Sequence, residues 1–192
     1  PHHTIEDNLH NVTQFSCFLY YHSFMLDFAK KYRDKIQIAF KPHPILKTNL
    51  YAHPDWGVNR TNEYYEQWQN LENGQLEEGG YIDLFLTSDA MIFDSLSFMC
   101  EYLYVGKPYI FTMKNKEVKH SFNEFGEEAF RNIYYSYSES DIENFINETV
   151  IAGNDPMKSI REKFFREQLL PPNGVSASEN IYNAIVSVVS NN

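Results

Sequence analysis

The stretch TSDAMIFDSLSFMCEYLYVGKPYIF, residues 87–111, has the form strand, turn, helix, strand. The apolar run Ser88–Phe93 predicts a short buried strand, and Leu96–Tyr104 predicts a helix that Gly106 closes. The next strand is expected over Lys107–Phe111, with proline near its start, where a strand tolerates it. This order of elements indicates one unit of an α/β fold with a parallel sheet.

Comparable units lie on both sides of this stretch. The run IQIAF, Ile36–Phe40, is β-branched and aromatic, as in buried parallel strands. Helices are expected at SFMLDFAKKYRDK, NRTNEYYEQWQNLE, SFNEFGEEAF, SESDIENFINETV, PMKSIREKFFREQLL and SASENIYNAIVSVV, a helical turn at Tyr81–Phe85 and a strand at NIYYSY. NGQ, residues 73–75, is interpreted as the break after the second helix. We therefore predict a single α/β domain over residues 1–192, with a Rossmann-like parallel sheet and helices on both faces.

The composition limits the classes of function. The 192 residues carry a formal net charge of −10, which argues against sequence-independent nucleic-acid binding, because such binding uses Lys and Arg to neutralise phosphates. No apolar run approaches the length that spans a bilayer. Cys17 and Cys100 lie far apart in apolar surroundings and indicate buried thiols rather than a disulfide or a zinc site. The chain begins PHHTIEDN without a methionine, which favours a piece of a longer protein.

Two polar segments follow predicted strands. In FKPHP, residues 40–44, Pro42 and Pro44 end the strand, so Lys41 and His43 project from a rigid corner. Ligands of open α/β sheets bind beyond the carboxyl ends of the strands. From this corner alone, two interpretations stay open: a ligand site, or an ordinary strand exit with Lys41 in solvent.

The second polar segment lies where a strand passes into a helix. The free N–H groups of a helix start can hold a phosphate, and the hydroxyls of Ser95 and Ser97 would add donors. Glu101 follows Ser97 by one helical turn, and its carboxylate could accept both hydroxyls of a ribose. The alternative is an ordinary N-cap, in which Asp94 or Ser95 satisfies the first N–H groups and Glu101 is only exposed.

Together, KPHP and SDAMIFDSLSFMCEYLYVGKPYIF resemble the C-terminal half of the CDP-glycerol glycerophosphotransferase family, whose enzymes build teichoic-acid-type and capsular polymers. That family has a basic-x-His-Pro corner after one strand, and a later Ser-Asp, hydrophobic strand and Asp-x-Ser-Ser-like segment complete its donor site. Here the serine pair is separated as Ser95-Leu96-Ser97. The tail PNGVSASENIYNAI is similar to the family's Asp-Gly-x-(Ala/Ser)-x-x-Arg-Ile ending, with Asn173 and Asn180 at the acidic and arginine positions. The resemblance runs from Ile36 to Ile185.

The resemblance implies the C-terminal half of a two-domain GT-B-type architecture, with the active site between the halves and the catalytic base in the missing N-terminal domain. The implied reaction moves a polyol phosphate from a CDP-polyol to a hydroxyl of a cell-surface polymer and releases CMP, with neither cofactor nor metal. This fragment alone is expected to bind nucleotide without turnover. The implied location is the cytoplasm, with peripheral contact to the inner face of the cell membrane as an alternative.

The resemblance also assigns roles to individual residues. It makes His43 catalytic and a ligand of the donor phosphate, with Lys41 beside it. Ser95 and Ser97 hold the pyrophosphate at the helix start, Glu101 and Asp94 take the ribose and nucleotide, and Asp89 supports the loop.

Several rival interpretations remain. A GT-B glycosyltransferase or nucleotide-sugar epimerase half would use a UDP-sugar, and a phospho-receiver-like signalling module would use Asp89, Asp94 and the Lys-Pro pair at 107 and 108. His2 and His3 are expected to be exposed rather than to form a metal site with His43. Two further sets have both a binding and a packing interpretation, namely the aromatic residues Tyr64, Tyr65 and Trp68 and the helix Pro156–Leu170, which could touch an anionic membrane.

Overall fold

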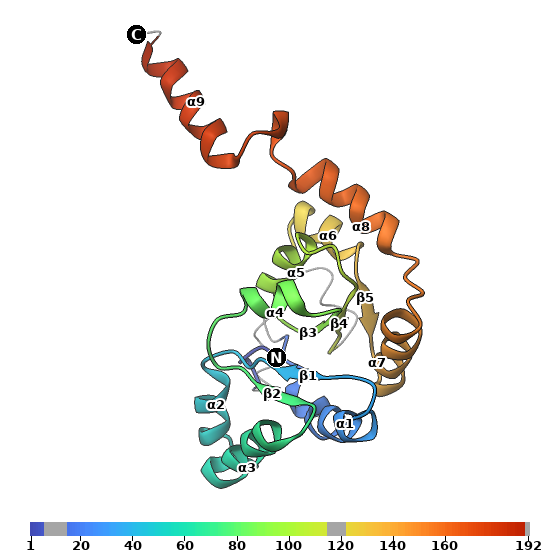
Figure 1. The fold of residues 1–192 in the computed structure, drawn as a ribbon. Helices are drawn as coiled ribbons and strands as arrows, with labels where there is room; N and C mark the ends of the chain where they lie inside the picture. Colours follow the sequence, from blue (N-terminus) through green and yellow to red (C-terminus); the bar gives the residue numbers. More distant parts are fainter. Residues whose placement is uncertain (6–14, 115–121, 191–192) are drawn as a thin grey trace.

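All strand pairings that the structure describes run parallel. The structure is a computed structural model, and it describes residues 1–5, 15–114 and 122–190. In one pair β1 (Ile38–Phe40) lies beside β2 (Gly74–Leu76), and in a second group β4 (Tyr109–Thr112) lies between β3 (Met91–Phe93) and β5 (Tyr134–Ser136). Helices lie on both sides of the strands (Figure 1). The predicted α/β class with parallel strands is confirmed.

Apart from α2, the helices lie close to their predicted positions, because the predictions rest on apolar spacing within each segment. Their bounds are α1 (Phe18–Lys31), α2 (Leu46–Ala52), α3 (Gly57–Asn70), α4 (Ile82–Thr87), α5 (Leu96–Leu103), α6 (Glu124–Phe130), α7 (Glu139–Asn144), α8 (Lys158–Phe164) and α9 (Ala177–Ser190). Wider π-helical turns continue α7 through Phe145–Ile151 and α8 through Phe165–Leu169, and a 3₁₀ turn covers Pro172–Gly174.

Two elements were not predicted, α2 and β2. The NGQ segment does end α3, but it also begins β2, whose three residues pair with β1. A side chain at Gly74 would meet the Leu71 Cβ atom and the Trp68 carbonyl oxygen, each 2.8 Å from an added Cβ. Asn73 donates from its side-chain amide to the carbonyl oxygens of Ala29 and Ile36, at 3.0 and 2.9 Å. Asn73 and Gly74, which the sequence analysis interpreted as a helix break, therefore hold the start of β2 in place.

The strands form two groups rather than the one continuous sheet that the sequence predicted. In the described part of the chain, ladder hydrogen bonds join β1 to β2 and join β3, β4 and β5 to one another. The two halves are connected by apolar contacts instead, because Phe28 of α1 packs with Ile110 of β4 and with Phe145 and Ile146 beyond α7. Each half also has its own core. Tyr64, Tyr65 and Trp68 lie in one of these cores, which confirms the packing interpretation for them.

The C-terminal helices differ in how they meet the body. Arg161 and Phe164 of α8 are buried, so the amphipathic segment from Pro156 packs on its own domain. Helix α9 buries none of its residues and extends away from the rest of the chain (Figure 1). No helix within the described ranges is both long enough and apolar enough to cross a bilayer.

Candidate functional site

A cavity of 1430 Å³ is lined by residues of both halves of the molecule. One part of its wall is formed by Ile36–Phe40 and by the proline corner, residues 41–44, which follows β1 in the sequence. Another part is formed by Ala90–Phe93 and by the start of α5, which follows β3. The polar segments that follow β1 and β3 both line this cavity, and ligands of α/β proteins commonly bind beyond the carboxyl ends of strands. The cavity brings together all seven residues that the sequence assigned to a site, Lys41, His43, Asp89, Asp94, Ser95, Ser97 and Glu101.

The proline corner holds His43 in a defined orientation. Its backbone N–H donates to the Pro1 carbonyl oxygen at 3.1 Å, and its carbonyl oxygen accepts the Leu46 N–H at 2.9 Å. The Nδ1 atom of His43 accepts the backbone N–H of Ile45 at 3.2 Å. A neutral imidazole that accepts at Nδ1 carries its hydrogen at Nε2. Burial, with the nearby His3 as a smaller cause, lowers the pKa of His43, so near neutral pH this side chain is a neutral Nε2–H donor.

Two further histidines stand beside His43. The ring centroids of His3 and His43 are 4.3 Å apart, as are those of His2 and His3, and His2 and His43 are 5.7 Å apart. The expectation that His2 and His3 are simply exposed is wrong, since both are half-buried in this stack. Burial lowers the pKa of His2 as well. Within the described ranges, no group of three or more His, Cys, Asp or Glu side chains could hold a metal ion.

Lys41 and Lys107 contribute differently to the cavity. Lys107 donates to the carbonyl oxygens of Leu86 and Ser88, so its ammonium braces the end of α4. Asp89, for which the family resemblance implies support of the neighbouring loop, lies exposed on the cavity wall. Lys41 is half-buried and pairs with no carboxylate in the described part of the chain. Its positive charge is therefore available to an anion in the cavity.

The start of α5 has no side-chain cap. Ser95 is the N-cap residue, with φ −111° and ψ 123°, yet its hydroxyl does not accept a first-turn N–H. That hydroxyl lies 3.1 Å from the hydroxyl of Ser97 instead. The ordinary N-cap interpretation of this segment is therefore wrong. An uncapped helix start with two neighbouring hydroxyls offers several donors to an anion.

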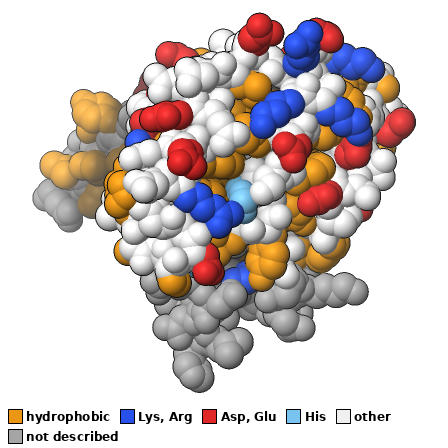
Figure 2. Space-filling view, turned by 90° about the horizontal axis from the view of Figure 1, so that it is seen from below, with side chains coloured by type: hydrophobic (Ala, Val, Ile, Leu, Met, Phe, Trp, Pro, Cys, Tyr) orange, Lys and Arg blue, Asp and Glu red, His pale blue; other side chains and the backbone are white. Residues whose placement is uncertain are grey.

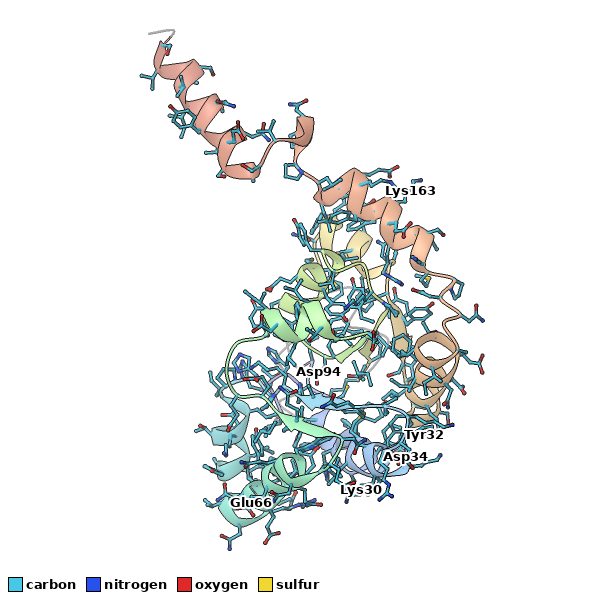
Figure 3. The ribbon with its side chains drawn as sticks, in the orientation of Figure 1. Lys30, Tyr32, Asp34, Glu66, Asp94 and Lys163 are labelled. Carbon is cyan, nitrogen blue, oxygen red and sulfur yellow. The ribbon has the colours of Figure 1, made fainter. Side chains whose placement is uncertain are left out.

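Asp94 points away from α5 and anchors the N-terminal segment. Its two carboxylate oxygens accept the backbone N–H groups of His2 and Cys17, the latter at 2.8 Å, and only 3% of the residue is exposed. Figure 3 shows Asp94 at the level where the two halves meet. Burial, and then the charge of Asp94, raise the pKa of Cys17 to about 12, so this thiol is not a nucleophile near neutral pH. Asp94 thus holds the segment that carries His2 and His3 beside the cavity.

Replacing Asp94 with asparagine is expected to lower the free energy of unfolding by about 1–3 kcal/mol, because one buried N–H group would lose its acceptor. Urea denaturation of the variant measures this directly. The matched control is Asp89→Asn, an exposed position on the same strand–turn unit, which we expect to change stability by less than about 0.5 kcal/mol. Equal stability of Asp94→Asn and the unmodified protein would contradict the anchoring role.

Glu101 lies one turn after Ser97 on α5 and is exposed to the cavity. Its Oε2 atom accepts the hydroxyl of Tyr81 at 2.7 Å. Tyr81 also lines the cavity and belongs to the segment that passes from one half to the other. Nothing in the local sequence around Tyr81 indicated a site, because its partner is 20 residues away.

The charged side chains that line the cavity are of both signs. Lys35, Lys41, Lys107 and Lys158 line it together with Asp89, Asp94, Glu101 and Asp155. Basic and acidic side chains are likewise interspersed on the face seen in Figure 2. This face shows no continuous basic patch of the kind that binds nucleic acid through its phosphates.

The fold and this cavity define an α/β protein whose candidate ligand site lies beyond the ends of parallel strands. Residues 18–187 match the family model described as CDP-Glycerol:Poly(glycerophosphate) glycerophosphotransferase, and the chain belongs to this family. Family membership indicates a transferase of the glycerophosphotransferase type and confirms the resemblance seen in the sequence. No curated protein and no solved structure matches the chain. The matched residues begin at the first residue of α1 and end within α9, whereas His2 and His3 lie outside them.

Proposed function

We propose that the cavity binds the nucleoside diphosphate of a CDP-polyol, and that this chain is the donor-binding half of a polyol-phosphate transferase. The observation that carries the proposal is the uncapped start of α5, where the hydroxyls of Ser95 and Ser97 line the same cavity as Lys41, whose ammonium pairs with no carboxylate among the described residues. These groups can hold two phosphates by hydrogen bonds and charge. Glu101, one turn further along α5, is then placed for the ribose.

In the proposed reaction, a hydroxyl of the acceptor polymer attacks the β-phosphorus of the CDP-polyol. A new bond forms between that phosphorus and the acceptor oxygen, the bond to the bridging oxygen breaks, and CMP leaves while the acceptor hydroxyl gives up its proton. Such transfers depend mainly on positioning and on stabilisation of charge on the phosphoryl oxygens. His43 supports this as an Nε2–H donor to a phosphate oxygen rather than as the base. The base belongs to an N-terminal domain that completes a GT-B-type cleft.

The polymer and the location follow from the same proposal. A cytidine-linked polyol donor fits synthesis of a teichoic-acid-type or capsular polymer, on the cytoplasmic side of the cell membrane with peripheral contact. The receiver-like alternative is disfavoured, because it needs a pair of available carboxylates and both oxygens of Asp94 are occupied by backbone N–H groups.

The test is an NMR titration of the ¹⁵N-labelled chain with CDP-glycerol, CDP, UDP and pyrophosphate. We expect CDP-glycerol and CDP to shift the amides of Ser95, Leu96 and Ser97, with weaker binding of UDP and the same helix-start shifts with pyrophosphate. A preference for UDP would favour the glycosyltransferase or epimerase alternative. Absence of shifts with CDP-glycerol and pyrophosphate alike would contradict a phosphate site at α5.

A further inference from the structure

Tyr81 connects two walls of the cavity through Glu101. It precedes α4, at the end of the connection that crosses from β2 toward β3, and its hydroxyl donates to the Oε2 atom of Glu101 at 2.7 Å. A hydrogen bond from a neutral hydroxyl to a carboxylate is among the stronger ones in proteins. The hydrogen bond also raises the pKa of Tyr81, so its phenol keeps its proton near neutral pH.

The ring of Tyr81 is held by other aromatic rings. Its centroid lies 4.8 Å from that of Phe98 and 5.0 Å from that of Phe85, and these two are 5.0 Å from each other. Phe85 in turn packs edge-on against the buried Tyr102, with 5.0 Å between the centroids. Contacts of this kind fix ring positions. The hydroxyl of Tyr81 is therefore placed by a packed cluster that reaches the core, although the residue itself lies on the cavity wall.

This arrangement limits how Glu101 can move. A glutamate side chain at an exposed helix position samples several rotamers, and fixing it costs conformational entropy when a ligand binds. With Oε2 held by Tyr81, the second oxygen, Oε1, accepts no hydrogen bond in the described part of the chain. Glu101 lines the cavity and lies one helical turn after Ser97 on α5. One carboxylate oxygen is thus fixed by the protein while the other remains for a ligand hydroxyl.

We propose that Tyr81 is a positioning residue that orients Glu101 toward the hydroxyls of the donor's ribose, so that the cavity selects ribonucleotides. The proposal rests on the proposed function, since it requires a nucleotide in this cavity. Tyr81 acts through Glu101 and is not catalytic. Pre-orientation removes part of the ordering cost of binding, so it raises affinity only for ligands that use the oriented group. Ligands without ribose hydroxyls therefore gain nothing from Tyr81.

The experiment measures dissociation constants of CDP, 2′,3′-dideoxy-CDP and pyrophosphate by calorimetry, for the unmodified chain and for Tyr81→Phe, which keeps the ring and removes the hydroxyl. We expect the unmodified chain to prefer CDP over the dideoxy nucleotide about 10-fold, and Tyr81→Phe to reduce this ratio to about one. Pyrophosphate affinity is expected to stay the same. The matched control is Tyr104→Phe. Tyr104 is an exposed tyrosine at the end of α5, the helix that carries Glu101, and its hydroxyl donates to the carbonyl oxygen of Leu169 outside the cavity. This variant should keep the preference for CDP over dideoxy-CDP.

The outcomes separate this inference from the proposed function. If Tyr81→Phe weakens CDP and dideoxy-CDP equally, Tyr81 only supports the fold and the inference is wrong while the nucleotide site stands. If the CDP preference survives in Tyr81→Phe, the inference is also wrong. If the unmodified chain binds neither CDP nor pyrophosphate, the proposed function fails and the inference fails with it. Thermal unfolding of Tyr81→Phe, expected to match the unmodified chain within a few degrees, shows that the variant folds.

Discussion

Replacing Arg161 with methionine is expected to lower the free energy of unfolding by about 3–5 kcal/mol, because it leaves a buried carboxylate without its cation. Arg161 is 1% exposed and its guanidinium pairs with both oxygens of Asp155, which is 12% exposed at its side chain. Tyr134 of β5 donates to the same carboxylate at 2.8 Å. The pair therefore fastens α8 to the strand group that forms one wall of the cavity.

The pH dependence of stability tests the same pair. Burial alone would raise the pKa of Asp155, but the hydrogen bonds from Arg161 and Tyr134 outweigh it and lower the pKa below the ordinary value of 3.8. A carboxyl whose pKa is lower in the folded state stabilises the protein above its unfolded-state pKa, and this contribution is lost as the pH falls through the folded-state value. The stability difference between the unmodified chain and Arg161→Met is therefore expected to shrink below pH 3.8.

Urea denaturation at pH 7 and at low pH provides the measurement. Arg166→Met is the matched control, because Arg166 is exposed on the next helical turn, and it is expected to change stability by less than about 0.5 kcal/mol. A double variant that replaces both Arg161 and Asp155 with apolar residues should lose less than Arg161→Met alone, since no charge then stays buried unpaired. A double variant as unstable as the sum of its single changes would contradict this explanation.

Replacing His43 with alanine is expected to weaken binding of CDP-glycerol by about 10- to 100-fold, the range for loss of a hydrogen bond to a charged group. CDP-glycerol is the suitable ligand because its diphosphate has an ester at each end and does not titrate near neutral pH. The chain offers a close control in His53→Ala. His53 also precedes a proline and accepts a backbone N–H at Nδ1, from Asp55 at 3.2 Å, but it does not line the cavity.

The affinity for CDP-glycerol should also rise as the pH falls. The pKa of His43 in the free chain is lowered by burial and by the neighbouring His3, with Lys41 as a smaller cause, whereas a bound diphosphate favours the imidazolium and raises this pKa. Binding then takes up a proton, so affinity increases between the bound and free pKa values and levels off below the free value. Because His2 lies in the same stack, the decisive comparison is with His43→Ala. A pH dependence that is unchanged in this variant would assign the proton uptake to another group.

All helices except α2, and all strands except β2, could be predicted from the sequence, because their signals are local. The apolar spacing in α5 and the proline after β1 identify these elements from neighbouring residues alone. Strand β2 was missed because it is three residues long and begins at Gly74, which by itself is typical of a turn. The formation of β2 depends on the close contact of Gly74 with Trp68 and Leu71. It also depends on pairing with β1, in which Gly74 lies opposite Ile38, a residue 36 positions earlier in the sequence.

The sequence by itself determined the α/β class, the parallel strands, the family resemblance and the set of candidate site residues. Only the tertiary structure decided how these residues are used. Asp94 stands in the segment that we propose to bind a ligand, yet its partners are backbone groups 92 and 77 residues away, and these contacts make it an anchor. The stack of His2 and His3 on His43 and the bond from Tyr81 to Glu101 likewise join distant segments. Local patterns record which side chains are present, whereas the partner of a side chain depends on which surfaces pack together.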